Sequence, residues 1–275
     1  MMHTEKRIRA RLENRKSGMC GAFLPYFTAG FPDAEATAAL IRHADSLGAA
    51  VVELGFPFSD SIADGPVIQE SFHYVLENGH KLENTFRLVS QVRKSVACGL
   101  VAMVSYSIVH RFGVDAFLAQ SAAAGFDGVI LPDVPVEESC LAVAAVTRAG
   151  LCHIGLVAPT TSPQRRIAIA KNSTGFVYQI AVSGITGERA RLADDLPQSV
   201  AELRRVSGLP VCVGFGVSSA DHVRQVCRYA DGAIVGSAII RRIDNALRAG
   251  LPRDELIRSV AGFLDELASG LVEES

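Results

Sequence analysis

The chain has 275 residues, of which 49% are apolar and 20% charged, and 27 Lys and Arg against 29 Asp and Glu give it a net charge of −2. This composition is typical of a globular protein and excludes disordered, collagen-like and coiled-coil chains. The balanced charge argues against a polyanionic partner such as nucleic acid or an anionic membrane surface.

Short apolar or β-branched runs recur along the chain and predict eight strands. These runs lie at 21–27, 50–55, 100–105, 128–131, 153–157, 175–180, 210–215 and 232–235. Segments with helical spacing alternate with them, at 33–47, 69–77, 83–96, 114–124, 136–149, 162–170, 196–206, 220–229 and 238–247. Because runs such as 51–55 are apolar on both faces, we expect parallel strands that are covered on both sides.

The predicted helices carry recognisable end signals. Caps are expected at Asp33, at Ser162 and at either Ser218 or Ser219, and Gly48, Gly125 and Gly150 are expected to end helices. Eight βα units without a break in composition predict one closed (β/α)8 TIM barrel over residues 1–275, with extra helices near 4–16 and 253–268. The alternative is a doubly wound open sheet.

Other features bear on the compartment. The longest apolar stretches, such as 141–146, are far shorter than the ~20 residues of a membrane-spanning helix, and residues 1–16 lack the apolar run of a signal peptide. The six cysteines are scattered, with no Cys-x-x-Cys pair, which favours buried structural thiols and a reducing, cytoplasmic location.

In a TIM barrel the chemistry lies at the carboxyl ends of the strands and in the loops that follow them. Glu53 follows Val51 and Val52 in a run that should be buried, where an ionised carboxylate is costly unless it is paired. Glu53 is therefore either a structural carboxyl with a buried polar partner or a general acid/base whose pKa is raised by burial. We favour the catalytic interpretation.

Asp64 lies eleven residues further on, in a loop punctuated by Pro57, Gly65 and Pro66. Taken alone it is typical of a turn aspartate. Paired with Glu53 it becomes a candidate second carboxylate, since two carboxyl groups in different environments can divide acid and base roles. Asp60 competes for either role.

Two glycine turns predict a phosphate site. They are Gly214-Phe215-Gly216, before a serine-capped helix, and Gly236-Ser237, at the start of the next. In barrels the loops after strands 7 and 8 often bind phosphate through backbone N–H groups and a helix N-terminus. The alternative is that these glycines only make tight turns. Gly184 and Gly187 resemble the hinges of a loop closing over the site.

Some chemistries lack support in the sequence. None of the five lysines falls at the carboxyl end of a predicted strand, which argues against a Schiff-base aldolase. The seven histidines show no metal-ligand spacing, and no Walker or dinucleotide-binding motif occurs.

These residues resemble the tryptophan synthase α subunit family. The segment Glu-Leu-Gly-Phe-Pro-Phe-Ser-Asp-Ser-Ile-Ala-Asp-Gly-Pro at 53–66 is similar to the family's signature, and so are segments at 25–30, 132–138, 184–187, 213–216 and 235–238. The resemblance covers nearly the whole chain and implies a (β/α)8 barrel. It also implies a lyase of tryptophan biosynthesis that cleaves indole-3-glycerol phosphate, by a retro-aldol reaction, to indole and glyceraldehyde 3-phosphate.

The resemblance implies roles for individual residues. Glu53 matches the acid/base that protonates the indole carbon and assists departure of the hydroxyl proton, and Asp64 matches the carboxylate that meets the indole N–H. Tyr178 matches a barrel residue near Glu53, and Thr186 a lid residue that helps to order Asp64. The phosphate site would comprise Gly187, Phe215, Gly216, Gly236 and Ser237.

The resemblance also implies a partner, a β subunit in an αββα complex. Pyridoxal phosphate is expected only on that β subunit, with no cofactor in this chain. Departures from the family pattern occur at Ser61, Ser105, Ser107, Ala181 and Val182. They leave the carboxylates intact but bear on coupling to the partner, so a free-standing indole-releasing lyase and a weakly active, partner-regulating barrel are kept as alternatives. A different sugar-phosphate isomerase or aldolase is a third.

Overall fold

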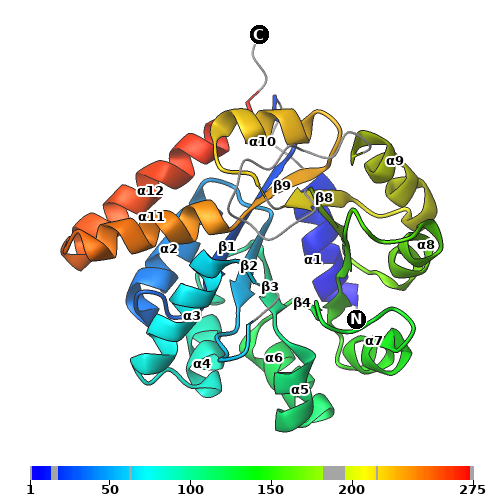
Figure 1. The fold of residues 1–275 in the computed structure, drawn as a ribbon, viewed down its shortest axis with the longest axis horizontal. Helices are drawn as coiled ribbons and strands as arrows, with labels where there is room; N and C mark the ends of the chain where they lie inside the picture. Colours follow the sequence, from blue (N-terminus) through cyan, green and yellow to red (C-terminus); the bar gives the residue numbers. More distant parts are fainter. Residues whose placement is uncertain (1, 14–17, 62–63, 182–195, 215, 273–275) are drawn as a thin grey trace.

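In the computed structural model, the ribbon is a ring of parallel strands surrounded by helices (Figure 1). The structure describes residues 2–13, 18–61, 64–181, 196–214 and 216–272. The strands are β1 (Ala22–Thr28), β2 (Val51–Gly55), β3 (Gly99–Met103), β4 (Gly128–Ile130), β5 (Cys152–His153), β6 (Gly155–Val157), β7 (Val177–Ile180), β8 (Val211–Gly214) and β9 (Gly232–Val235). The predicted TIM barrel is confirmed.

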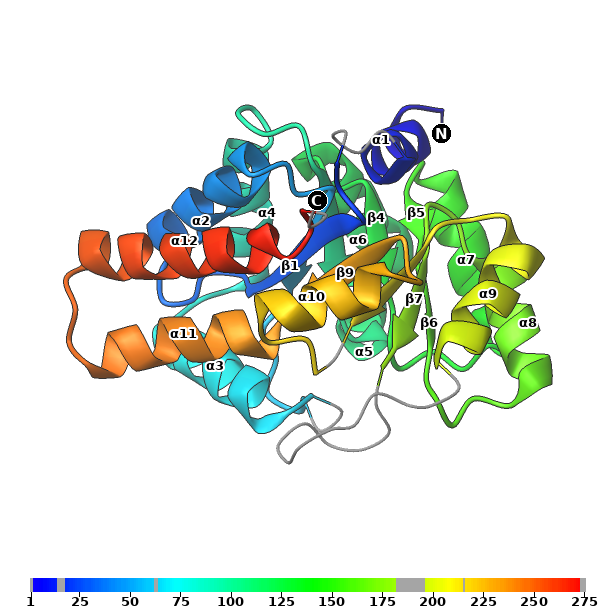
Figure 2. The same cartoon turned by 90° about the horizontal axis from the view of Figure 1, so that it is seen from above.

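The helices of the outer layer follow the strands in alternation. They are α2 (Ala34–Ser46), α3 (Pro66–Glu77), α4 (Leu82–Val92), α5 (Tyr106–Phe112), α6 (Val114–Ala124), α7 (Ser139–Arg148), α8 (Pro163–Asn172), α9 (Leu196–Ser207), α10 (Ala220–Cys227), α11 (Ser237–Arg248) and α12 (Arg253–Ser269). A further helix, α1 (Met2–Glu13), lies across one end of the barrel rather than in the outer layer (Figure 2). The short helix α5 was not predicted.

The strand order shows how the ring is closed. It runs β5-β4-β3-β2-β1-β9-β8-β7-β6 with every pair parallel, and β5 and β6 are consecutive pieces of one stretch joined at Ile154. The first piece pairs with β4 at Gly128↔Cys152, and the second pairs with β7 at Gly155↔Val177. The predicted strand at 153–157 is thus two short strands that bond to different neighbours.

Most predicted helix ends are found. The Asp33 carboxylate accepts from Ala36 N at 2.8 Å, and Ser219 rather than Ser218 caps α10 by accepting from His222 N at 3.2 Å. Ser162 precedes Pro163 at the first turn of α8. Gly125 ends α6 in the left-handed conformation, with a φ of 104° that disfavours any residue with a Cβ.

The core has two layers separated by the strands. The larger layer lies between the strands and the outer helices, and the smaller one fills the barrel lumen. Ile8 and Leu12 of α1 belong to the lumen layer, so this helix closes the end of the barrel at which the strands begin.

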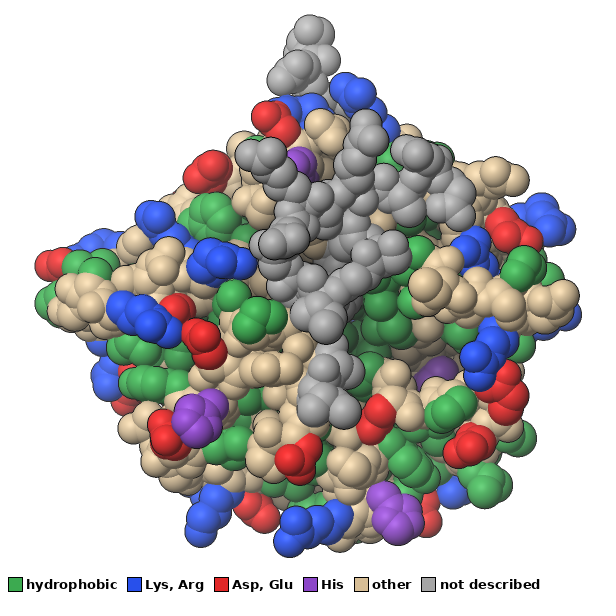
Figure 3. All heavy atoms as spheres, viewed as in Figure 1, with side chains coloured by type: hydrophobic (Ala, Val, Ile, Leu, Met, Phe, Trp, Pro, Cys, Tyr) green, Lys and Arg blue, Asp and Glu red, His purple; other side chains and the backbone are tan. Residues whose placement is uncertain are grey.

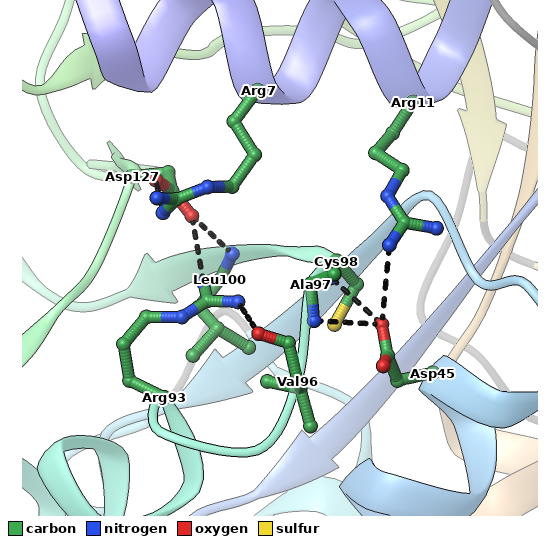
Figure 4. Close-up of polar contacts among 9 residues, drawn as sticks. All are labelled: Arg7, Arg11, Asp45, Arg93, Val96, Ala97, Cys98, Leu100 and Asp127. Atoms are coloured by element: carbon green, nitrogen blue, oxygen red, sulfur yellow. Dashed lines mark hydrogen bonds and ion pairs between the residues drawn. The ribbon is translucent and has the colours of Figure 1, made fainter.

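Ion pairs attach α1 to this floor (Figure 4). The carboxylate of Asp127, which is fully buried, lies 2.5 Å from Arg7 Nη1 of α1 and 3.1 Å from Arg93 Nη1, and it also accepts from Leu100 N at 2.9 Å. Burial raises the pKa of Asp127 while the two guanidinium groups lower it. Asp45 accepts from Ala97 N and Cys98 N and faces Arg11 at 3.8 Å.

Candidate active site

Glu53 lies inside the barrel on β2, with its side chain fully buried. Alternation along the strand points Glu53 and Gly55 to the lumen and Leu54 outward. Neither carboxyl oxygen of Glu53 has a hydrogen-bond partner among the described residues. Burial therefore raises its pKa to about 8, and no described charge offsets the effect. A buried polar partner, the structural alternative for Glu53, is absent from the described part of the chain.

Two buried tyrosines flank Glu53. Tyr26 on β1 is its register partner, and Tyr178 lies on β7. The pKa of each phenol is raised mainly by burial and also by the negative charge of Glu53, so both rings stay neutral. The charge of Glu53 thus acts on the phenol of Tyr178, the residue that the family resemblance places near Glu53.

Glycines at the strand ends make room for the two phenols. A Cβ at Gly55 would lie 1.9 Å from Tyr26 Oη, and one at Gly214 would lie 2.3 Å from Tyr178 Oη. Each hydroxyl therefore occupies the space that a side chain would take on the neighbouring element. Tyr26 was not among the predicted site residues. No local pattern singles it out, because tyrosine is common in β-strands.

Asp64 stands in the loop between β2 and α3, immediately before the cap of that helix. Its backbone is anchored: Asp64 N donates to Ser61 O at 3.0 Å, and Gln69 Nε2 donates to both Asp64 O at 2.8 Å and Ser61 O at 2.9 Å. Burial raises the pKa of Asp64 to about 6. The competing Asp60 is exposed and accepts from Ser59 Oγ.

The negative charges of Asp64 and Glu53 both act on the phenol of Tyr26. Both carboxylates raise the pKa of Tyr26, with Asp64 the stronger of the two. No described lysine, arginine or histidine acts on the pKa of Glu53, Asp64, Tyr26 or Tyr178. The mouth therefore brings together two carboxyl groups with unequal pKa values and a neutral phenol.

The predicted phosphate residues lie partly within the described chain. Gly236 precedes α11, Ser237 is the first residue of that helix, and Gly236 O is bonded by Ile239 N and Ile240 N. Gly216 is exposed, with a φ of 81°. Thr186, Gly187 and Phe215, with Gly184 and Val182, lie outside the described residues.

The departures near the mouth belong to a small polar cluster. Ser105 Oγ donates to Asp133 Oδ2 at 2.6 Å, and Tyr106 N donates to both oxygens of Asp133. Ser107 lies 2.7 Å from Ser105 through the two hydroxyl oxygens. The Asp133 carboxylate is thus occupied in holding the start of α5. Ser61 is buried in the Asp64 loop, and Ala181 follows β7 without exposure.

A cavity of about 600 Å³ opens beside α3, outside the barrel lumen. It is lined by Phe58, Ser59, Ser61, Gln69, Glu70, His73, Leu76 and Glu77. On the face of the molecule in Figure 3, acidic and basic side chains are interspersed, and neither sign forms a continuous patch.

The cysteines differ in their exposure to solvent. Cys98, Cys152, Cys212 and Cys227 are buried, whereas Cys140 is exposed. The described residues contain no group of three His, Cys, Asp or Glu side chains arranged to hold a metal ion. No helix in the described part of the chain is long and apolar enough to cross a membrane.

Comparison with known proteins gives consistent results. The sequence model of a family described as "Tryptophan synthase alpha chain" matches residues 12–262. The tryptophan synthase alpha chain of Picosynechococcus sp. is 40% identical over 258 residues, covering 94% of this chain and 96% of the relative. That of Rhodopirellula baltica is 42% identical over 240 residues, covering 86% of this chain and 84% of the relative.

Solved structures agree with this. The structure of tryptophan synthase subunit alpha from Legionella pneumophila superposes with a TM-score of 0.84 at 32% identity, covering 96% of this chain and 98% of that one. A chain of tryptophan synthase from M. tuberculosis gives a TM-score of 0.82 at 32% identity, covering 97% of this chain and 99% of that one.

Proposed function

The chain belongs to the tryptophan synthase alpha chain family, and from this premise we propose that it is a carbon–carbon lyase that cleaves indole-3-glycerol phosphate to indole and glyceraldehyde 3-phosphate. The observation that carries the proposal is Glu53, a fully buried carboxyl without a described hydrogen-bond partner, on a strand whose following loop carries Asp64. A carboxyl kept neutral at neutral pH can deliver a proton to carbon, which this cleavage requires.

In the proposed reaction Glu53 gives up one proton and later accepts another. Indole is a poor leaving group until its C3 atom is protonated, so neutral Glu53 gives its proton to that carbon. The C3–C1′ bond then breaks, its electron pair returns to the indole ring, and the hydroxyl on C1′ loses its proton as the aldehyde forms. Ionised Glu53 accepts that proton and returns to its starting state.

Asp64 is assigned to stabilise the positive charge that forms on the indole nitrogen. With a pKa of about 6 it is ionised at pH 7, whereas Glu53 with a pKa of about 8 is largely neutral there. Protonation of C3 places positive charge on the indole nitrogen, and an ionised carboxylate facing that N–H stabilises the charge. The two carboxyl groups therefore take opposite roles because burial raises their pKa values to different extents.

The phosphate end of the substrate fits the start of α11. Helix N-termini carry unpaired backbone N–H groups and a partial positive charge that favours an anion. Gly236 and Ser237 stand at that N-terminus, directly after β9. This strand pairs with β1, which carries Tyr26. Gly216, with Gly187 and Phe215, completes the set that we assign to this subsite on family resemblance, and Thr186 is assigned to the lid that helps to order Asp64.

We assign the chain a tryptophan synthase β subunit as partner, with pyridoxal phosphate on that subunit, and a cytoplasmic location. A free-standing lyase is the second candidate. It is favoured by the cluster at Ser105 and Asp133, where the carboxylate is already occupied within the chain. Adding a β subunit to the purified chain distinguishes the two, since a partner-dependent enzyme is accelerated and a free-standing one is not.

A substrate panel tests the reaction itself. The chain should release indole from indole-3-glycerol phosphate and leave simple triose and pentose phosphates unchanged, with or without a β subunit. Conversion of a sugar phosphate in preference to the indole compound would assign a different isomerase or aldolase. Tight binding of a glycerol phosphate analogue without any turnover would assign the partner-regulating role.

A further inference from the structure

The backbone of Asp64 lies in a short turn between β2 and α3. Asp64 N donates to Ser61 O at 3.0 Å, which brings the two ends of the turn together. Gly65, the next residue, caps α3 without a side-chain hydrogen bond, because glycine has no side chain to donate or accept one. The turn therefore depends on groups outside it for its place at the mouth of the barrel.

Gln69, a half-buried residue on α3, holds this turn from the helix side. Its Nε2 donates to Asp64 O at 2.8 Å and to Ser61 O at 2.9 Å. A side-chain amide nitrogen carries two N–H donors, so both are used on the turn. Ser61 O accepts a second bond, from Asp64 N, and Ser61 is buried. The two bonds from Gln69 fix both ends of the turn, and with them the backbone from which the Asp64 side chain projects.

The helix that carries Gln69 is itself attached to the barrel. The Ser71 hydroxyl donates to Ile68 O at 2.7 Å and lies 2.7 Å from Thr28 Oγ1 at the end of β1. Because the single proton of Ser71 is used on Ile68 O, Thr28 is the donor in this buried pair. Phe58, from the loop after β2, packs against Phe72 of α3 with 5.7 Å between ring centroids. Contacts from β1 and from the loop after β2 thus hold α3 in place.

We propose that Gln69 is a positioning residue that holds the Asp64 backbone at the mouth of the barrel through its two amide donors. It acts on the reaction through Asp64 and does not itself take part in bond breaking. A group that stabilises developing charge must be held close to its productive position, because a displacement of about 1 Å can cost about a hundredfold in rate. The catalytic consequence rests on the proposed function, whereas the anchoring of the turn does not.

The substitution Gln69→Met tests the anchoring, because it keeps the length of the side chain and removes both donors without adding charge. Hydrogen exchange of the Asp64 amide, followed by NMR, needs no turnover. We expect it to become at least about tenfold faster in Gln69→Met, while the amides of β2 keep their rates. Gln91→Met, at an exposed position on α4, is the matched control and should leave the Asp64 amide unchanged.

Unchanged exchange at Asp64 in Gln69→Met would overturn the proposal. Acceleration by the same factor at Asp64 and in β2 would overturn it too, because the variant would then only be less stable overall. If Gln69→Met does not fold, Gln69→Glu replaces it under the same criteria, since an ionised carboxylate also lacks donors.

A double-mutant cycle with Asp64→Asn tests the catalytic consequence. Gln69→Met should lower kcat for indole release about ten- to a hundredfold and change KM by less than about threefold. In the Asp64→Asn background the same substitution should lower kcat by less than about twofold, because the carboxylate that Gln69 positions is gone. An equal loss in both backgrounds, or an unchanged kcat, would contradict a role through Asp64. A parent chain that releases no indole would refute the proposed function, and the exchange result would then decide on the anchoring alone.

Discussion

The substitution Glu53→Gln should stabilise the folded protein while removing its activity. In the folded chain burial raises the pKa of Glu53 to about 8, against an ordinary value of 4.5. Between these two values the unfolded chain has released the proton and the folded chain retains it, so the stability falls as the pH rises. Below the lower value both states are protonated and nothing is lost. Above the higher value both are ionised and the full cost is present.

The magnitude follows from the size of the shift. At about 1.4 kcal/mol per pH unit, the shift corresponds to about 5 kcal/mol above pH 8, and to about 3 kcal/mol at pH 7. Glutamine has nearly the same shape and no charge, so its own burial cost does not vary with pH. The stability gained by the variant should therefore grow by about 4 kcal/mol between about pH 5 and about pH 9.

Urea denaturation of both proteins across this pH range measures that growth. The comparison uses the change with pH, which cancels any constant cost of burying an unpaired amide. Glu70→Gln, at an exposed position on α3, is the control and should give a nearly constant difference. A difference for Glu53→Gln that stays flat with pH would contradict this prediction, because Glu53 would then titrate alike in the folded and unfolded chains.

Other parts of the molecule give further tests. The rate of indole formation should peak near neutral pH, falling below about 6 as Asp64 is protonated and above about 8 as Glu53 ionises; a rate that holds to pH 10 would contradict this. Asp127→Ala leaves Arg93 and Leu100 N on the barrel floor without their shared partner, so it should lower the free energy of unfolding by about 3–5 kcal/mol. Asp115→Ala, in an exposed ion pair, should lower it by less than about 1 kcal/mol, and equal losses would argue against the floor network. Gly214→Ala places a Cβ 2.3 Å from Tyr178 Oη and should lower kcat at least about tenfold without unfolding the chain, and unchanged kcat would show that the phenol position is immaterial.

The sequence predicts the barrel well because each βα unit carries its own local pattern. The helix bounds of α6, for example, agree with the apolar spacing and with Gly125 at its end. Local pattern does not report which neighbour a strand bonds to, and so the division at Ile154 was not predicted. It also missed α5, which is short and depends on the Asp133 carboxylate from the loop after β4.

The site was predictable where a residue conflicts with its surroundings. Glu53 stands out as an ionisable group in an apolar strand, and the structure shows it buried and without a described partner. Tyr26 gives no such signal, since a tyrosine is at home in a strand. Its place beside Glu53 and against Gly55 arises only when β1 and β2 pair. The link between Arg7 and Asp127, 120 residues apart, is likewise invisible to local pattern.

The proposed mechanism requires that neutral Glu53 and ionised Asp64 act together on one substrate. Its most direct test is the rate of indole release from indole-3-glycerol phosphate at pH 7 by the parent chain, Glu53→Gln and Asp64→Asn, each shown to be folded. We predict that either substitution lowers this rate by about two to four orders of magnitude. Turnover within a few-fold of the parent chain in either variant would contradict the account.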